Sequence, residues 1–362
     1  MLNEKEKHRY SRHLLLDKVG LQGQEKLKAA KVLVIGAGGL GCPVLQYLTA
    51  AGVGTIGVID FDVVDETNLQ RQILFSVNDI GKNKALAAKH HLEQQNPYIS
   101  IKAFAEKLTT KNALELVQQF DVIVDGTDNF STRYLVNDAC VITEKPLVYG
   151  SIYKFEGQVS VFNYNNGPSY RCLFPEPPKA GSVPNCSQIG VIGVLPGLIG
   201  TQQANETLKI ILEIGTVLSG KLLIYDALSG NSTSINIKRS EEQIDKTKAM
   251  KPHFASFNYD AFCGIDLINT IDITELKELL KSENIQVVDV REEWEQPRIN
   301  ELNALIAPLD DLDDFVNQID RNKKVVMVCQ RGARSLQAIL HLKKEYGFNN
   351  LINLEGGLLN WK

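Results

Sequence analysis

The 362-residue chain lacks a long hydrophobic run and a strong excess of charge of either sign. Its most apolar stretch, residues 189–200, is too short and too interrupted by glycine and proline to cross a bilayer. The first ten residues lack the apolar core of a signal peptide. A net charge of −4 gives no electrostatic reason to expect a nucleic-acid partner. We therefore expect a cytoplasmic protein of two or three domains, with neither nucleic acid nor membrane among its partners.

Paired cysteine motifs are also absent. The six cysteines are scattered and none has CxxC spacing: Cys42, Cys140, Cys172, Cys186, Cys263 and Cys329. In a chain of this length such spacing excludes a disulfide framework and favours a reducing compartment. A reactive thiol must therefore be found from its local setting.

Strands and helices alternate from Lys31 to Gly150, which predicts a Rossmann-like, mostly parallel sheet with helices on both faces. A basic, amphipathic helical segment over residues 1–30 precedes them. We expect strands at 31–35, 55–60, 99–104, 121–125 and 147–150, and helices at 39–51, 82–95, 109–118 and 131–143.

An antiparallel extension is predicted next. Residues 157–174 have the pattern of a strand, an Asn-Gly turn and a second strand, and residues 221–239 that of a closing hairpin after a helix ending near 214. Residues 241–268 are polar and rich in lysine, which indicates a linker. A small α/β unit follows. The predicted domains are therefore 1–240 and 269–362.

A glycine-rich turn follows the first strand of the sheet. Its spacing, Gly36-x-Gly38-x-x-Gly41 with Gly39 between, lets phosphates approach the backbone N–H groups at a helix N-terminus. Asp60 ends the next strand and can accept hydrogen bonds from ribose hydroxyls. NAD and ATP fit these residues equally well.

The residues after Asp60 favour ATP. Asn68, Arg71 and Lys84 lie just beyond this strand, and two added cations suit a triphosphate whose charge shifts during reaction. Asp128 follows another strand of the same sheet, where a carboxylate facing a triphosphate is explained as a Mg²⁺ ligand.

Together the motifs RYSRH, GAGGLG, DFDxVxxxNLQRQ, GKxKA and DGTDN, with Cys186 before a GVIG-rich helix, resemble the MoeB/ThiF family of ubiquitin-activating-type adenylyltransferases over about residues 1–240. The resemblance implies ATP and Mg²⁺ as cofactors, and a homodimer in which Arg12 reaches into the partner subunit's site. By position it implies a nucleotide site made of Gly36, Gly38, Gly39, Gly41, Asp60, Asp62, Asn68, Arg71, Lys84 and Asp128, with Asp128 holding Mg²⁺.

The resemblance also implies a protein substrate, a small ubiquitin-like sulfur carrier ending in Gly-Gly. Its C-terminal carboxylate is ionised at neutral pH, so the reaction needs no general base. Catalysis needs positioning and positive charge, which Arg71, Lys84 and Mg²⁺ supply.

Two further thiols separate by their setting. Cys186 lies on a loop rich in proline and glycine just before a helix, where a lowered thiol pKa makes it a candidate nucleophile. Cys42 opens the helix after Gly41, and there we favour a packing role.

Many members of this family carry zinc on two CxxC pairs, and this chain departs from that pattern. The first position is Ser169 beside Cys172, and Cys263 stands alone. Because a structural zinc site needs four such ligands, we predict no tetrathiolate zinc and a core position for Cys172.

A second motif with catalytic chemistry lies in the small C-terminal unit. Cys329 ends a strand, and a loop leads to a helix starting near Ser335, a geometry that stabilises a thiolate or persulfide anion. The loop resembles the rhodanese active site; its members are Gln330, Arg331, Gly332, Ala333 and Arg334. Four residues between Cys329 and Arg334 favour sulfur chemistry over the longer phosphatase loop. The usual docking segment is replaced by residues 297–309.

The two motifs lead to one hypothesis. The first domain forms an acyl-adenylate on the carrier, and Cys329 delivers persulfide sulfur to it, for molybdopterin or thiamine biosynthesis. Cys186 forms a thioester with the carrier or resolves an acyl-disulfide, and the persulfide comes from a cysteine desulfurase or thiosulfate. The alternatives are an NAD-dependent oxidoreductase, an enzyme adenylating an amino-acid or tRNA-linked carboxylate, and a non-catalytic nucleotide-binding scaffold.

Overall fold

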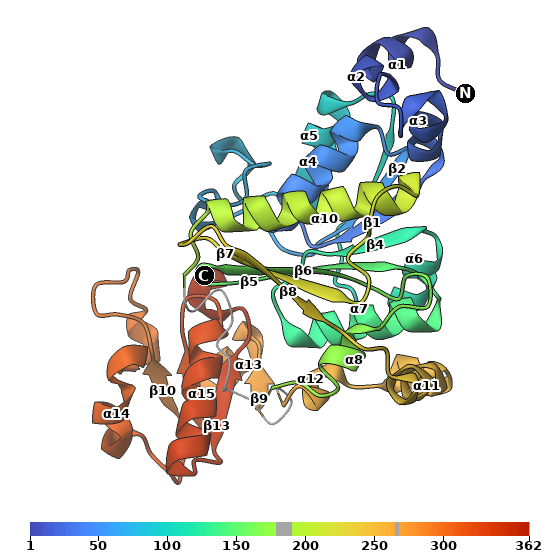
Figure 1. The fold of residues 1–362 in the computed structure, drawn as a ribbon. Coiled ribbons are helices and arrows are strands. Elements are labelled where there is room, and N and C mark those ends of the chain that lie inside the picture. Colours follow the sequence, from blue (N-terminus) through green and yellow to red (C-terminus); the bar gives the residue numbers. More distant parts are fainter. Residues whose placement is uncertain (179–189, 265–267, 362) are drawn as a thin grey trace. The chain divides into compact units, whose positions relative to one another are not determined.

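The computed structural model describes residues 1–178, 190–264 and 268–361 (Figure 1). The chain divides into a larger compact unit that ends at Tyr259 and a smaller one that runs from Asp260 to the C-terminus. In the described residues no helix is long and apolar enough to cross a bilayer.

The larger unit is built on an eight-stranded sheet in the order β3-β2-β1-β4-β5-β6-β7-β8. Neighbouring strands are parallel from β3 to β5 and antiparallel from β5 to β8, which confirms the predicted fold class. The strands are β1 Lys31–Ile35, β2 Thr55–Ile59, β3 Ser100–Phe104, β4 Val122–Asp125, β5 Leu147–Tyr153, β6 Glu156–Phe162, β7 Lys221–Asp226 and β8 Ser232–Asn236.

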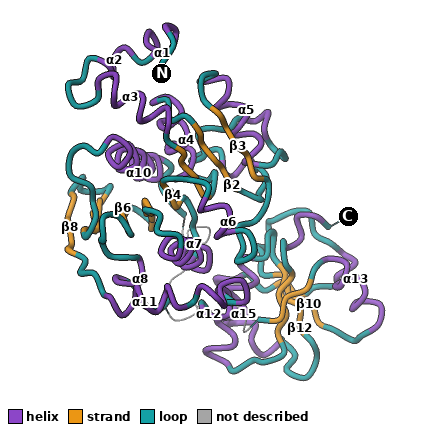
Figure 2. The backbone as a smooth tube through the Cα atoms, turned by 90° about the vertical axis from the view of Figure 1, so that its right-hand side faces the viewer, coloured by secondary structure: helices purple, strands orange, loops and turns teal. Residues whose placement is uncertain are grey.

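Helices cover both faces of this sheet (Figures 1 and 2). Helices α4, α5 and α10 share one core with the strands, while α6 and α7 lie on the opposite face. The helices are α1 Glu4–Arg9, α2 Ser11–Leu14, α3 Gly20–Ala29, α4 Gly41–Ala51, α5 Lys84–Gln95, α6 Ala113–Gln118, α7 Phe130–Ile142, α8 Tyr170–Leu173, α10 Val194–Leu212, α11 Glu241–Ala249 and α12 Tyr259–Phe262.

The strand order positions the first candidate site. β1 is paired with β2 on one side and β4 on the other, and the chain crosses to opposite faces after them. Crevices of parallel sheets open at the carboxyl ends of the strands where the order reverses. The segments after Ile35, Ile59 and Asp125 therefore meet at one edge.

The smaller unit has a parallel five-stranded sheet in the order β11-β10-β12-β13-β9. Figure 2 labels two of its strands, β10 and β12. Its strands are β9 Asn269–Ile271, β10 Gln286–Asp289, β11 Leu305–Ile306, β12 Val325–Val328 and β13 Leu351–Leu354. Its helices are α13 Ile273–Ser282, α14 Leu312–Phe315 and α15 Ala333–Tyr346. β12 is central and fully buried, so the loop after Val328 stands at the middle of the sheet edge.

One predicted strand is wrong. The segment after the Asn-Gly turn forms the short helix α8, and β6 pairs instead with β5 and β7. Ser169 is the N-cap of α8 and forms a capping box, in which its side chain accepts from the Cys172 N–H and the Cys172 side chain accepts from the Ser169 N–H. This reciprocal cap satisfies donors that a strand partner would otherwise have to satisfy.

The stretch predicted to be an irregular linker is largely helical in its described residues. It begins with α11, a 3₁₀ turn at Lys251–Ser256 and α12, and Phe254 is fully buried. The Tyr259 hydroxyl donates to the Asp138 carboxylate at 2.8 Å. Because these apolar groups are spread at wide spacing among lysines, composition alone did not predict their burial.

Candidate active sites

The glycine-rich turn lies tightly against the segment that follows β4. Gly36 has φ +91°, and a Cβ there would lie 2.9 Å from the Gly126 carbonyl oxygen. A Cβ on Gly41 would overlap the Gly36 carbonyl oxygen. At Gly38 the nearest atom would be Gln72 Nε2 at 3.9 Å, an ordinary contact, so that backbone has room beside it. Such space at a helix N-terminus suits a phosphate.

Arg71 lies beside this turn. A Cβ on Gly39 would meet Pro196 at 3.1 Å and the Arg71 Cδ at 3.6 Å, so the aliphatic part of Arg71 passes next to the glycines. Its guanidinium donates to the Thr67 carbonyl at 3.2 Å. Asn68, in the same turn, is buried, with 5% of its surface exposed.

Asp60 connects β2 to the turn. Its Oδ2 accepts from Ala37 N at 2.7 Å and its Oδ1 from Asp62 N at 2.9 Å. Burial raises the pKa of this carboxyl, while nearby Lys84 and the two amides act against that rise. The contacts hold the carboxylate at the mouth of the turn, where it can accept from a ribose.

Lys84 begins α5 and is only 6% exposed. A lysine buried to this extent normally has a carboxylate partner. Its ammonium lies 3.1 Å from Asp62 Oδ2, and Asp62 is itself half exposed. Asn83 donates to the carbonyls of Asp60 and Asp62 and so pins the segments together. Lys84 is therefore held at this edge of the sheet by a partner that is itself open to solvent.

Asp128 follows β4 and is exposed just before α7, whose N-cap is Asn129. Within the described ranges no three His, Cys, Asp or Glu side chains are grouped to hold a metal ion. Mg²⁺ is commonly held by one or two carboxylates together with substrate phosphates, and a single exposed Asp128 fits that arrangement.

A buried polar network supports this edge, and the sequence reasoning missed it. Asp125 is fully buried, and its Oδ2 accepts from Arg133 Nε at 3.3 Å. Its Oδ1 accepts from the backbone N–H of Thr127 at 2.9 Å. Arg133 also donates to the Thr127 carbonyl at 3.0 Å, and Gln203 of α10 donates to the Asp125 carbonyl at 2.7 Å. A carboxylate at the last residue of a strand with an arginine eight residues later was the available signal.

Arg12 lies apart from the glycine-rich turn. Arg12 is exposed on α2, beside Tyr10, whose ring fills the space a Cβ on Gly52 would take. Gly52 ends α4, whereas the glycine turn begins that helix, so about 16 Å of helix separates them. Cys186 lies outside the described residues.

The remaining thiols of the larger unit have structural surroundings. Cys42 is fully buried and its Sγ lies 3.5 Å from the Ala37 carbonyl; burial raises its thiol pKa to about 12. Cys172 Sγ accepts from the backbone N–H groups of Ser169 and Ser240, each at 3.3 Å. Cys172 thus joins α8 to the start of α11, and the absence of zinc stays a prediction.

The second site is the loop between β12 and α15. Cys329 is 1% exposed, and Gly332 N donates to its Sγ at 3.0 Å. The hydroxyl of Ser335 lies 3.5 Å from the same sulfur and donates to Asn353 at 2.7 Å. A backbone N–H aimed at the sulfur stabilises its anion.

The segment after β13, which includes Leu358 and Leu359, hydrogen-bonds to the backbone of this loop. Leu358 N donates to the Cys329 carbonyl at 2.9 Å, and Leu359 N donates to Gln330 O at 3.0 Å. Gly332 has φ +87°, and a Cβ there would lie 2.8 Å from the Leu354 carbonyl oxygen. The tail that the sequence associated with the loop is therefore part of its framework.

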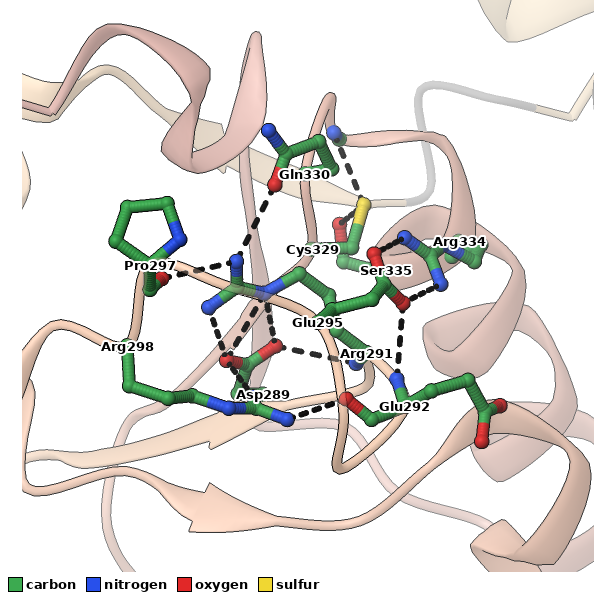
Figure 3. Close-up of polar contacts among 11 residues, drawn as sticks. Asp289, Arg291, Glu292, Glu295, Pro297, Arg298, Cys329, Gln330, Arg334 and Ser335 are labelled. Atoms are coloured by element: carbon green, nitrogen blue, oxygen red, sulfur yellow. Dashed lines mark hydrogen bonds and ion pairs between the residues drawn. The ribbon is translucent and has the colours of Figure 1, made fainter.

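Arginines and carboxylates surround the loop (Figure 3). Asp289, at the end of β10, pairs with Arg291 and with Arg298, each at 2.7 Å. Arg291 also donates to the side chain of Gln330 at 3.2 Å. Arg334 pairs with Glu295, so each of these three guanidinium groups has a carboxylate partner.

Comparison with known proteins identifies the class. Residues 10–246 match the model of the ThiF family, and residues 272–362 match that of the rhodanese-like domain. The chain therefore belongs to the ThiF family and carries a C-terminal rhodanese-like domain. It is an adenylyltransferase, which uses ATP, and a sulfurtransferase; this excludes the NAD-dependent oxidoreductase and the non-catalytic scaffold.

Named relatives match the whole chain or the greater part of it. The chain is 41% identical to the probable adenylyltransferase/sulfurtransferase MoeZ of Mycobacterium tuberculosis, over 99% of this chain and 94% of that protein. It is 47% identical to the sulfur carrier protein adenylyltransferase of Thermus thermophilus, over 72% of this chain and 98% of that one. Among solved structures, Escherichia coli MccB with ATP matches at a TM-score of 0.57 and 26% identity, covering 66% of this chain and 73% of that one.

Proposed function

We propose that this enzyme adenylates the C-terminal glycine carboxylate of a small ubiquitin-like sulfur carrier and converts it to a thiocarboxylate. The observation that carries the proposal is that one chain has two anion-binding loops of different chemistry. One turn has room beside Gly38 with Arg71 next to it, and the other aims a backbone N–H at the sulfur of Cys329. The names of the relatives in Mycobacterium tuberculosis and Thermus thermophilus support the same carrier chemistry.

In the first step the carrier carboxylate attacks the α-phosphorus of ATP and pyrophosphate leaves. Arg71 and Lys84 neutralise the phosphates, and Asp60 orients the ribose. Mg²⁺, held by Asp128 and the phosphates, would neutralise further charge. Hydroxide is a poor leaving group and AMP a good one, so the adenylate is open to attack by sulfur.

In the second step a persulfide on Cys329 attacks the activated carbonyl and AMP leaves, which gives an acyl-disulfide. Attack by the Cys186 thiolate on the Cys329 sulfur then forms a Cys186–Cys329 disulfide and releases the thiocarboxylate. In the alternative, the Cys186 thiolate displaces AMP first, and the persulfide attacks the resulting thioester and releases Cys186. The enzyme acts as a homodimer in which Arg12 serves the partner subunit's site, and its product serves molybdopterin or thiamine biosynthesis.

Intact-mass spectrometry of candidate Gly-Gly carriers, incubated with enzyme, ATP, Mg²⁺ and a sulfur donor, tests the proposal. We expect one oxygen of the carrier to be replaced by sulfur. Arg71→Ala should abolish carrier-dependent pyrophosphate exchange, whereas Cys329→Ser should retain the exchange and lose the sulfur. Exchange that survives Arg71→Ala at the wild-type rate, or that depends on a free amino acid, contradicts the proposal.

A further inference from the structure

The Cys329 loop is rich in cations, and three of the guanidinium groups around it are paired with carboxylates. Arg291 and Arg298 share the carboxylate of Asp289, which is 3% exposed. These two arginines are held against the framework of the loop rather than offered to a ligand. Arg334, at the start of α15, is 31% exposed and is the more accessible of the three.

The guanidinium group of Arg334 is paired with the carboxylate of Glu295 (Figure 3). Both of its terminal nitrogens donate to the carboxylate, one to Oε2 at 2.7 Å and the other to Oε1. Glu295 is 16% exposed, and its Oε1 also accepts from Glu292 N at 2.9 Å. The ion pair with Arg334 holds the pKa of Glu295 below its ordinary value, so this carboxylate is charged at neutral pH.

This pairing separates two classes of sulfur donor. Thiosulfate is a dianion that leaves sulfite, also a dianion, when the Cys329 thiolate takes its outer sulfur. Such a donor needs a free cation near the thiol, and the planar fork of an arginine suits an oxyanion. To bind at Arg334 it has to displace Glu295 and approach against that negative charge.

A persulfide on a protein thiol, R–S–SH, makes no such demand. The Cys329 thiolate attacks the outer sulfur, the S–S bond of the donor breaks, and the donor leaves as R–S⁻. The product is the persulfide Cys329–S–SH. No oxyanion has to be bound at any point, so the Glu295–Arg334 pair can stay intact.

We propose that Glu295 is a specificity-determining residue that occupies Arg334 and so directs Cys329 toward protein-borne persulfides and away from thiosulfate. This inference rests on the proposed function and names the donor class for its sulfur step. Glu295 acts through Arg334 and is a positioning residue rather than a catalytic one.

Steady-state kinetics with cyanide as acceptor test the inference in the full-length enzyme, without ATP or carrier. Glu295→Gln should lower the KM for thiosulfate about tenfold. Its KM for a persulfidated peptide with blocked termini and no charged side chains should stay within about twofold of wild type. Glu295→Asp keeps the carboxylate and should stay close to wild type with both donors. The matched control is Glu293→Gln, which removes an exposed carboxylate from the same loop.

An unchanged KM for thiosulfate in Glu295→Gln overturns the inference. So does an equal loss of kcat/KM with both donors, because it marks a purely structural pair. The readout is independent of adenylation, so a selective gain with thiosulfate would stand even if no carrier became a thiocarboxylate, and that second result would count against the proposed function alone.

Discussion

Glycines in the nucleotide turn differ in what surrounds them, and this difference separates folding from binding. Gly41 is enclosed by the Gly36 carbonyl, whereas Gly38 has room beside it. A side chain at position 41 must therefore disturb the backbone between β1 and α4. A methyl at position 38 makes only an ordinary contact with Gln72 and enters the space assigned to a phosphate.

We therefore expect Gly38→Ala to fold normally and to raise the KM for ATP about tenfold. Gly41→Ala should lower the free energy of unfolding by several kcal/mol, on the order of 3 kcal/mol, because its Cβ overlaps backbone. Urea unfolding followed by circular dichroism, and pyrophosphate exchange at varied ATP, measure the two effects. An unaltered KM in Gly38→Ala would show that the phosphates lie elsewhere.

Thiol reactivity is a second property of single residues. Burial holds the pKa of Cys42 at about 12, so at pH 8 about one molecule in ten thousand is thiolate there. Cys42 becomes reactive as the pH rises toward that pKa or when the protein unfolds. Iodoacetamide at pH 8 should leave native Cys42 unmodified and label it fully in urea, as read by peptide mass spectrometry. Rapid labelling of native Cys42 would contradict its burial.

At the scale of the element, alternation and turn signals predicted much of the fold. The helices after β1, β2 and β4 and the closing hairpin were predicted within a few residues, because each has buried apolar residues at regular spacing. The short strands β9 and β11 were missed, since two or three residues carry no period. Helix α8 was missed because the Asn-Gly turn before Ser169 is typical of a hairpin and predicts a second strand.

The site divides in a similar way. Glycines, Asp60, Arg71 and Cys329 belong to continuous motifs, so the sequence predicted their neighbourhoods. Partners far apart in the chain, such as Gln203 with Asp125 or Asn353 with Ser335, come together only through the sheet order. No spacing in a single sequence encodes such pairs.

The helical segment from α11 to α12 gives an element-scale prediction. Phe254 is fully buried in the larger unit, so Phe254→Ala should destabilise that unit by about 3–5 kcal/mol. Differential scanning calorimetry should show a lower melting temperature for one transition, with Lys251→Ala, an exposed neighbour, as control. A melting curve unchanged by Phe254→Ala would restore the interpretation of this segment as a linker.

At the scale of the whole molecule, the proposed dimer makes the two nucleotide sites depend on each other. Arg12 and the glycine turn lie at opposite ends of α4, so Arg12 cannot serve its own subunit's turn. Lys84, in the proposed site, would serve its own subunit. An Arg12→Ala subunit and a Lys84→Ala subunit should therefore complement each other.

Each variant alone should lack pyrophosphate exchange. After mixing and subunit exchange, half of the dimers are mixed and each has one complete site, so about a quarter of wild-type activity should return. Lys89→Ala, which changes a partly exposed lysine on the same helix as Lys84, is the control that should stay active alone. Failure of the mixture to recover activity, with mixed dimers shown by native mass spectrometry, would place Arg12 outside the site.

The close backbone contacts under both loops also restrict how this chain can evolve. Gly36 and Gly41 in one loop and Gly332 and Gly357 in the other have no room for a side chain. Substitutions at these positions would disturb the backbone, so the conformation of each loop cannot be adjusted by changing these residues. New substrates must be acquired through the rim, at positions such as Arg71 and Asp128 or Glu295 and Arg334, where side chains can change and the backbone need not.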